Sequence, residues 1–268
     1  MTSILPAWSA QFVPPQQVST GGLPITDEWA VGDSDGSGVI VAIVDSGVDE
    51  SHPKVAGPFA TGAALSFDAE QGEIVTAVGS HDDLYGHGTA CAAIIRSHAP
   101  ACEIMSVRVL GERLTGKGPV FAEGLRWALA QGARVLNLSL STSKLALVEL
   151  FHDVADEAAH AGAVLVCAMN NVPAPTFPSQ FSSVISVAAT TEDGLFIGPE
   201  APADFGAPGI DVEVAWLDRG MLTVTGNSFA APWVAGLVTR ILSAHPELRP
   251  YEVKAVLRNL AANATPRR

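Results

Sequence analysis

The sequence lacks any run of 18 or more apolar residues, so it predicts no transmembrane helix. Its N-terminus has neither the basic start nor the continuous apolar core of a secretory signal. Cysteine is scarce, and the three that are present show no paired spacing that would indicate a disulfide framework. These absences together favour the cytoplasm over secretion, because free thiols persist in a reducing compartment.

Basic residues are also few. The chain has 15 Lys and Arg residues against 28 Asp and Glu residues, which gives a formal net charge of −13 at pH 7. Nucleic acids and anionic membrane surfaces repel a protein of this charge, so both are excluded as expected partners. The hydrophobic content of 48% and the 18 prolines spread along the chain are typical of an ordered globular protein.

The order of the sequence patterns predicts one α/β domain. Residues 1–37 are rich in Pro, Gly and Ser and predict an irregular N-terminal arm, whereas residues 38–268 alternate between short apolar runs and helical patterns. Continuous apolar strands separated by helices indicate a mostly parallel sheet with helices on both faces. The expected strands cover 38–47, 103–110, 133–140, 163–170 and 183–190, and the expected helices cover 86–97, 118–132, 147–162, 228–244 and 250–261.

Polar side chains follow three of the predicted extended segments. Asp45 ends the first strand, Asn170 and Asn171 end another, and Ser228 follows the run MLTVT. Sites in parallel α/β sheets form outside the carboxyl ends of the strands, so we expect these groups to meet. Each residue alone also has a structural explanation, such as an Asx-turn at Asp45 or a helix cap at Ser228.

The combination favours chemistry over structure. Asp45, then His87 in a Gly-flanked helix start, then Ser228 follow one of the known chain orders of a Ser-His-Asp triad. An α/β-hydrolase esterase is excluded, because the fifth residue of its Gly-x-Ser-x-Gly motif is Ala230 here and no Asp follows Ser228.

Three segments carry a family resemblance. VAIVDSGVDESHP, GHGTACAAII and TGNSFAAPWVAG resemble the signature blocks of the subtilisin-like serine proteases, or subtilases, and the resemblance spans residues 23–260. It implies a serine endopeptidase in which Asp45 supports His87, His87 takes the proton of Ser228, and an acyl-enzyme forms. It further implies that the side chain of Asn171 and the backbone N–H of Ser228 stabilise the oxyanion.

The resemblance also implies a peptide substrate bound as an extended strand, with no cofactor or metal needed for catalysis. Two departures stand out: Asn170 replaces a family glycine, which would narrow the specificity pocket, and Asn227 replaces a threonine. The calcium loop that many subtilases carry after the helix of the catalytic histidine is missing, which leaves a structural calcium ion uncertain. The expected substrate-binding residues are Gly116, Lys117, Gly118, Leu138, Ser139, Leu140 and Asn170.

Several alternatives remain open at this point. The enzyme could be a dedicated processing protease for a specific or modified precursor peptide, or an inactive peptide-binding pseudoprotease. Residues 1–15 could be a short inhibitory extension that lies across the active site, or a flexible terminus. The HDD triplet at 81–83 offers metal-ligand side chains but lacks a second cluster to complete a site.

Overall fold

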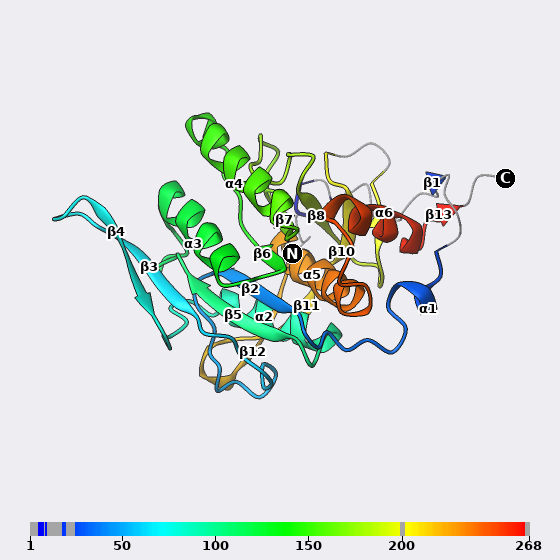
Figure 1. Ribbon diagram of the computed structural model, residues 1–268, viewed down its shortest axis with the longest axis horizontal. Coiled ribbons are helices and arrows are strands. Elements are labelled where there is room, and N and C mark those ends of the chain that lie inside the picture. Colours follow the sequence, from blue (N-terminus) through cyan, green and yellow to red (C-terminus); the bar gives the residue numbers. More distant parts are fainter. Residues whose placement is uncertain (1–4, 8, 10–17, 20–24, 199–201, 266–268) are drawn as a thin grey trace.

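The structure is a computed structural model that describes residues 5–7, 9, 18–19, 25–198 and 202–265. A nine-stranded sheet crosses the molecule, and its neighbouring strands are parallel except at the pairs β4–β3 and β10–β9 (Figure 1). In spatial order the strands are β4 (Glu73–Val78), β3 (Ala63–Asp68), β5 (Glu103–Arg108), β2 (Ile40–Asp45), β6 (Val135–Leu138), β7 (Val164–Ala168), β8 (Ile185–Thr190), β10 (Phe205–Pro208) and β9 (Phe196–Ile197).

The central strand β2 shows why the sheet is apolar on both sides. Val41 and Ile43 pack into the core on one face, and Ala42 and Val44 pack into the core on the other. Because successive side chains of a strand point to opposite faces, a strand covered on both faces has a continuous apolar sequence. This confirms the predicted fold class of a mostly parallel sheet between two helical layers.

Helices cover both faces of the sheet (Figure 1). The first core contains residues from α2 (His87–His98), α5 (Asn227–Ala244) and α6 (Pro250–Leu260). The second contains residues from α3 (Gly118–Ala130) and α4 (Val148–His160), and a short 3₁₀ turn, η2 (Leu145–Leu147), precedes α4. No helix in the described part of the chain is both long enough and apolar enough to cross a bilayer.

Two expectations about secondary structure were wrong. The run MLTVT is not a strand of the main sheet, because β12 (Met221–Val224) pairs only with β11 (Val212–Ala215) in a separate antiparallel hairpin whose tip contains η3 (Leu217–Arg219). The arm over residues 1–37 is not wholly irregular either, since it contains α1 (Asp27–Ala30) and β1 (Val18–Ser19), which pairs with β13 (Ala264–Thr265). These elements of two to four residues are too short to show a hydrophobic period.

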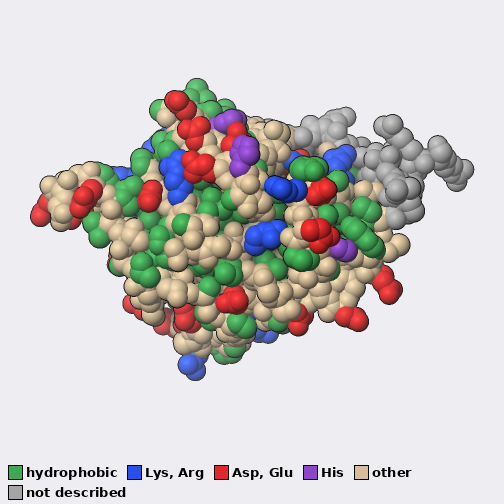
Figure 2. Space-filling model, viewed as in Figure 1, with side chains coloured by type: hydrophobic (Ala, Val, Ile, Leu, Met, Phe, Trp, Pro, Cys, Tyr) green, Lys and Arg blue, Asp and Glu red, His purple; other side chains and the backbone are tan. Residues whose placement is uncertain are grey.

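The projecting hairpin of β3 and β4 was not foreseen (Figure 1). Five of the six residues of β4 are exposed, so the strand has no buried face to mark it in the sequence. On the face drawn in Figure 2, acidic and basic side chains are interspersed rather than gathered into one patch of single sign. That face therefore offers no extended basic surface to a nucleic acid.

Candidate active site

A buried carboxylate and a histidine form the centre of the site. Asp45 is the last residue of β2 and is fully buried, and His87 is the first residue of α2. The His87 Nδ1 atom lies 2.9 Å from each of the two Asp45 carboxylate oxygens. The backbone N–H of Ser46 also donates to Asp45 Oδ1. The carboxylate thus holds the imidazole in one orientation, with Nδ1 turned toward the protein interior.

The start of α2 is held by a second buried carboxylate. Asp83 accepts hydrogen bonds from the hydroxyls of Ser46 and Thr89, and from the backbone N–H groups of Tyr85, Gly86 and Thr89. A carboxylate beside these N–H groups also complements the positive end of the helix dipole. Asp83 therefore fixes the turn that presents His87.

Glycines allow the approach of α2 to β2. Gly86 has φ 103°, a left-handed conformation that favours glycine at the turn before His87. Gly88 packs directly on the carbonyl of Gly47, and a Cβ atom at position 88 would overlap that oxygen. The His-Gly and Asp-Ser-Gly segments are therefore held at backbone contact, which brings Asp45 within reach of His87.

The electrostatics of the pair follow from its burial. Burial alone would lower the pKa of His87, but the neighbouring Asp45 carboxylate outweighs this, and the pKa of His87 is raised well above its usual value. A buried imidazole next to a buried carboxylate is stabilised in its charged form. The pair is therefore suited to take up a proton during a reaction.

Ser228 lies next to this pair at the start of α5. The ring of Phe229, its neighbour in the chain, is 5.2 Å from the His87 ring, measured between centroids. The Cys91 Sγ atom lies 4.0 Å from His87 Nδ1 and 3.9 Å from the Ser228 carbonyl oxygen. Ser228 is partly exposed, and its hydroxyl makes no hydrogen bond to any described residue. It is therefore accessible beside the histidine.

Asn171 borders the site from the loop after β7. Its side-chain Oδ1 atom accepts a hydrogen bond of 2.9 Å from the backbone N–H of Asn227. The amide group Nδ2 is thereby turned away from Asn227 and makes no hydrogen bond to a described residue. Asn171 is exposed, so this donor is accessible to a bound molecule.

A cavity of about 260 Å³ extends from His87 between two edge segments. Five of the seven expected substrate-binding residues line it: Gly116, Gly118, Leu138, Ser139 and Leu140. Most of the remaining lining is apolar and includes Leu110, Leu114, Phe121, Leu147, Phe151 and Phe177. The cavity thus offers an apolar space beside the pair of Asp45 and His87.

The other two expected residues lie elsewhere. The Lys117 ammonium sits 3.3 Å above the centroid of the Phe67 ring, a cation–π contact with β3. Asn170 does not line this cavity, and its backbone N–H and carbonyl bond to Thr176 and Asn227. Ser139 is buried, and its hydroxyl accepts hydrogen bonds from Asn137 Nδ2 and from the Cys91 thiol. The hydroxyl is thus used within the protein, and we expect other atoms of Ser139 to form its part of the cavity wall.

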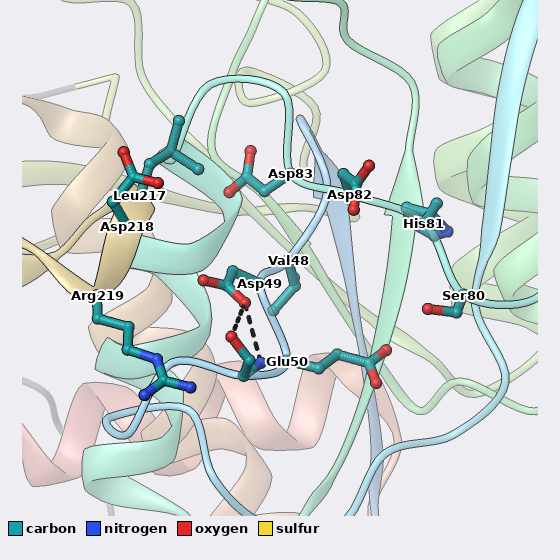
Figure 3. Close-up of a pocket in the computed structure, with 11 residues that line it drawn as sticks. Val48, Asp49, Glu50, Ser80, His81, Asp82, Asp83, Leu217, Asp218 and Arg219 are labelled. Carbon is teal, nitrogen blue, oxygen red and sulfur yellow. Dashed lines mark hydrogen bonds between the residues drawn. The ribbon is translucent and has the colours of Figure 1, made fainter.

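A second hollow of about 720 Å³ lies beside the turn that holds His87 (Figure 3). Asp49, Glu50, Asp82, Asp83 and Asp218 make its lining acidic, and Arg219 also lines it. Two of these acidic side chains have hydrogen-bond partners within the protein: Asp83 holds the turn before His87, and Asp49 Oδ1 accepts from the backbone N–H and the hydroxyl of Ser51.

The HDD triplet does not assemble a metal site. His81 bonds through its ring to the Gly79 carbonyl and the Ser106 hydroxyl, whereas Asp83 bonds to the start of α2. Within the described ranges, the one group of three candidate ligands within 4.8 Å of one another is Asp45, His87 and Cys91. Burial raises the pKa of the Cys91 thiol, which makes it a poor ligand and a poor nucleophile at neutral pH.

Sequence reasoning missed the place of Cys91 at this site. Cys91 looks like a small buried apolar residue in the sequence, yet its sulfur touches His87. The N-terminal arm, already considered as a segment that could lie across the active site, contacts it at two residues: the backbone N–H of Ala7 donates to the Asn171 carbonyl at 2.8 Å, and the Ser9 hydroxyl donates to Asn227 Oδ1 at 3.4 Å. The helical spacing of four between His87 and Cys91 was a usable signal, because such residues share a helix face. Apart from residues 5–7 and 9, the expected inhibitory segment 1–15 lies outside the described residues.

Comparison with known proteins gives consistent matches. The model of the subtilase family matches residues 36–268. Thermitase of Thermoactinomyces vulgaris is 29% identical, over 89% of this chain and 84% of that protein. Subtilisin Savinase of Lederbergia lenta is 30% identical, over 85% of each. A thermostable alkaline protease of Halalkalibacterium halodurans is 28% identical, over 92% of this chain but only 65% of that longer protein.

The fold matches a solved structure as well. The crystal structure of a cold-adapted subtilisin-like serine proteinase superposes with a TM-score of 0.65 at 24% sequence identity. The match covers 88% of this chain and 86% of that one. At this identity the likeness establishes the shared fold.

Proposed function

This chain belongs to the subtilase family of subtilisin-like serine endopeptidases, and we propose that it cleaves peptide bonds with Asp45, His87 and Ser228 as its catalytic residues. The observation that carries the proposal is the buried pair in which His87 Nδ1 meets both oxygens of Asp45, beside the first turn of α5. A histidine with a purely structural role would not need a buried carboxylate on one side and an accessible serine nearby.

The geometry supports a defined order of steps. The Nδ1–H of His87 donates to Asp45, so Nε2 is the nitrogen free to take the Ser228 proton. The Ser228 oxygen then forms a bond to the scissile carbonyl carbon, and His87 gives the proton to the leaving amine as the peptide C–N bond breaks. In the second half of the reaction His87 takes a proton from water, and the water oxygen forms a bond to the acyl carbon. His87 then returns the proton to the Ser228 oxygen as the ester bond breaks and the acid is released.

The negative charge that develops on the oxygen of the scissile carbonyl must be stabilised by hydrogen-bond donors. The backbone N–H of Ser228, at the positive end of α5, and the Nδ2 group of Asn171 are the two that this site offers. Such donors act by being in place before the charge develops.

The cavity beside His87 supports a substrate class. Gly116 and Gly118 lie on one wall, and Leu138 and Leu140 lie on the other. A peptide laid between these segments could extend the β-structure of both while its apolar side chains enter the cavity. We therefore expect extended or unfolded polypeptides with apolar residues before the cleaved bond to be preferred.

Replacing Asn171 by alanine tests this assignment. We expect kcat for a peptide substrate to fall by about 10²–10³-fold with little change in KM, an effect size known from the equivalent donor of subtilisin. The control is Val172→Ala, which shortens an exposed side chain of the same loop and is expected to leave kcat unchanged. A similar loss in both variants would mean that the loop, not the amide of Asn171, matters.

We further propose that the N-terminal segment competes with the substrate. Support comes from the Ala7 N–H on the Asn171 carbonyl and from the Asn227 amide on the Ala7 carbonyl. Deletion of residues 1–15 is expected to lower KM by roughly tenfold without a change in kcat, because a tethered competitor raises the apparent KM only. Steady-state kinetics of both forms measure this, and an unchanged KM would discard the idea.

A further inference from the structure

Asn227 is a fully buried amide directly before the proposed nucleophile. It is the first residue of α5, yet the hydrogen bonds of its side chain to described residues all lead to segments outside that helix. The Oδ1 atom instead accepts from the backbone N–H of Ala189 at 2.9 Å and from the Ser9 hydroxyl at 3.4 Å. The side chain therefore serves segments outside the helix.

The donor side of this amide holds the loop after β7. Asn227 Nδ2 donates to the carbonyls of Met169 and Asn170, at 3.3 and 3.1 Å, and also to the Ala7 carbonyl at 3.2 Å. Met169 and Asn170 are the two residues immediately before Asn171. Their carbonyls are thus tied to the residue immediately before Ser228.

The backbone of Asn227 completes the connection. Its N–H donates to the Oδ1 atom of Asn171 at 2.9 Å. That bond turns the amide of Asn171, while the Asn227 side chain holds the loop from which Asn171 projects. One residue therefore fixes both the position and the rotation of the oxyanion donor relative to the nucleophile.

We propose that Asn227 is a positioning residue that sets Asn171 for oxyanion stabilisation. This inference rests on the proposed function of Asn171 and extends it to a residue that does not touch the substrate. Because donors must already be in place when charge develops, a shift of the loop by a fraction of an ångström weakens them. A buried amide with this many partners leaves the loop little freedom to shift.

Two variants of the full-length protein test the proposal. Asn227→Asp keeps the size and the acceptor oxygen but replaces the donor by an oxygen that faces three carbonyls. Asn227→Thr carries the residue of the family pattern, which is compatible with the fold, and shortens the side chain. We expect kcat to fall about tenfold or more in both with KM for substrate not raised, and by less than the about 10²–10³-fold loss in Asn171→Ala.

The decisive measurement is a double-mutant cycle. If Asn227 acts through Asn171, then Asn227→Thr has no further effect on kcat once Asn171 is alanine. Saturating substrate isolates this effect, because release of the N-terminal segment alters KM alone. Thr239→Val is the control, since it removes a buried hydrogen bond from the same helix far from the site, and it should leave kcat unchanged.

Other outcomes overturn the proposal. Equal losses of kcat in Asn227→Thr with and without Asn171 would show that the two residues act independently. An unchanged or higher kcat in Asn227→Thr would show that the amide does not support catalysis. If instead wild-type protein hydrolyses no peptide, or Asn171→Ala retains full kcat, the proposed function of the site fails rather than the role of Asn227.

Discussion

Replacing Ser228 by alanine is expected to abolish peptide hydrolysis, with a fall in kcat of about 10⁶-fold, the size of effect known for the same change in subtilisin. The neighbouring Cys91 cannot replace Ser228 as the nucleophile, because it is buried and its burial raises the pKa of its thiol. KM should change little, because Ser228 contributes little to peptide binding. Peptide hydrolysis under saturating substrate measures the loss.

The loss should not add to that of His87→Ala. Each change alone removes the same proton-transfer step, so the double variant is expected to be no slower than either single variant. Ser243→Ala is the matched control, because it removes a half-buried serine hydroxyl, which donates to the Ser37 carbonyl, from the far end of the same helix. Independent, multiplying effects of Ser228→Ala and His87→Ala would contradict a shared step.

The second large effect is expected for Asp45→Asn. An amide can offer N–H to His87 Nδ1 and stabilise the wrong tautomer, so kcat should fall by about 10⁴-fold, as found for the equivalent change in trypsin-like enzymes. A crystal structure of the variant should show the His87 imidazole in its wild-type position. The loss of kcat would then be due to the tautomer of His87 and not to a change in its position.

The pH profile gives the sign of the electrostatic effect. Burial favours neutral His87, but Asp45 outweighs it and raises the pKa of His87 well above its usual value. His87 must be neutral to accept a proton, so kcat/KM of the wild type should fall as pH drops through this raised pKa. Asp45→Asn removes the largest influence that raises the pKa of His87 while burial still lowers it, so the acidic limb should move to lower pH.

An exposed carboxylate provides the control for that profile. Asp82→Asn removes a charge from the rim of the acidic hollow without touching His87, and its acidic limb should stay close to that of the wild type. An acidic limb in Asp45→Asn at the wild-type pH would mean that Asp45 does not set the charge of His87.

Local sequence signals were enough for the fold class, and they singled out three candidate residues whose catalytic roles were predicted from their chain order and from the family resemblance. Asp45 ends a buried apolar run, and His87 and Ser228 begin apolar helices, so each is marked by its neighbours. The rule that polar groups gather at the carboxyl ends of parallel strands applies to Asp45 and to Asn171. It failed for Ser228, because β12 with its exposed residues belongs to a separate hairpin.

Contacts between distant segments were beyond local patterns. Asn227 was visible only as a departure from a family threonine, and nothing near it indicates that its amide meets Ala7, Met169 and Ala189. Asp83 resembled a metal ligand in the sequence because it belongs to the HDD triplet. Its actual role could not be predicted, since its five hydrogen bonds form only when α2 packs against the end of β2. Such roles depend on tertiary packing.

Labelling with a fluorophosphonate probe tests the central claim most directly, because the probe reacts only with an activated serine. Wild-type protein is expected to be labelled, whereas Ser228→Ala and His87→Ala, checked for folding by circular dichroism, are expected to remain unlabelled. Labelling that persists in Ser228→Ala, or a folded wild type that stays unlabelled with and without residues 1–15, would contradict an Asp45–His87–Ser228 catalytic site.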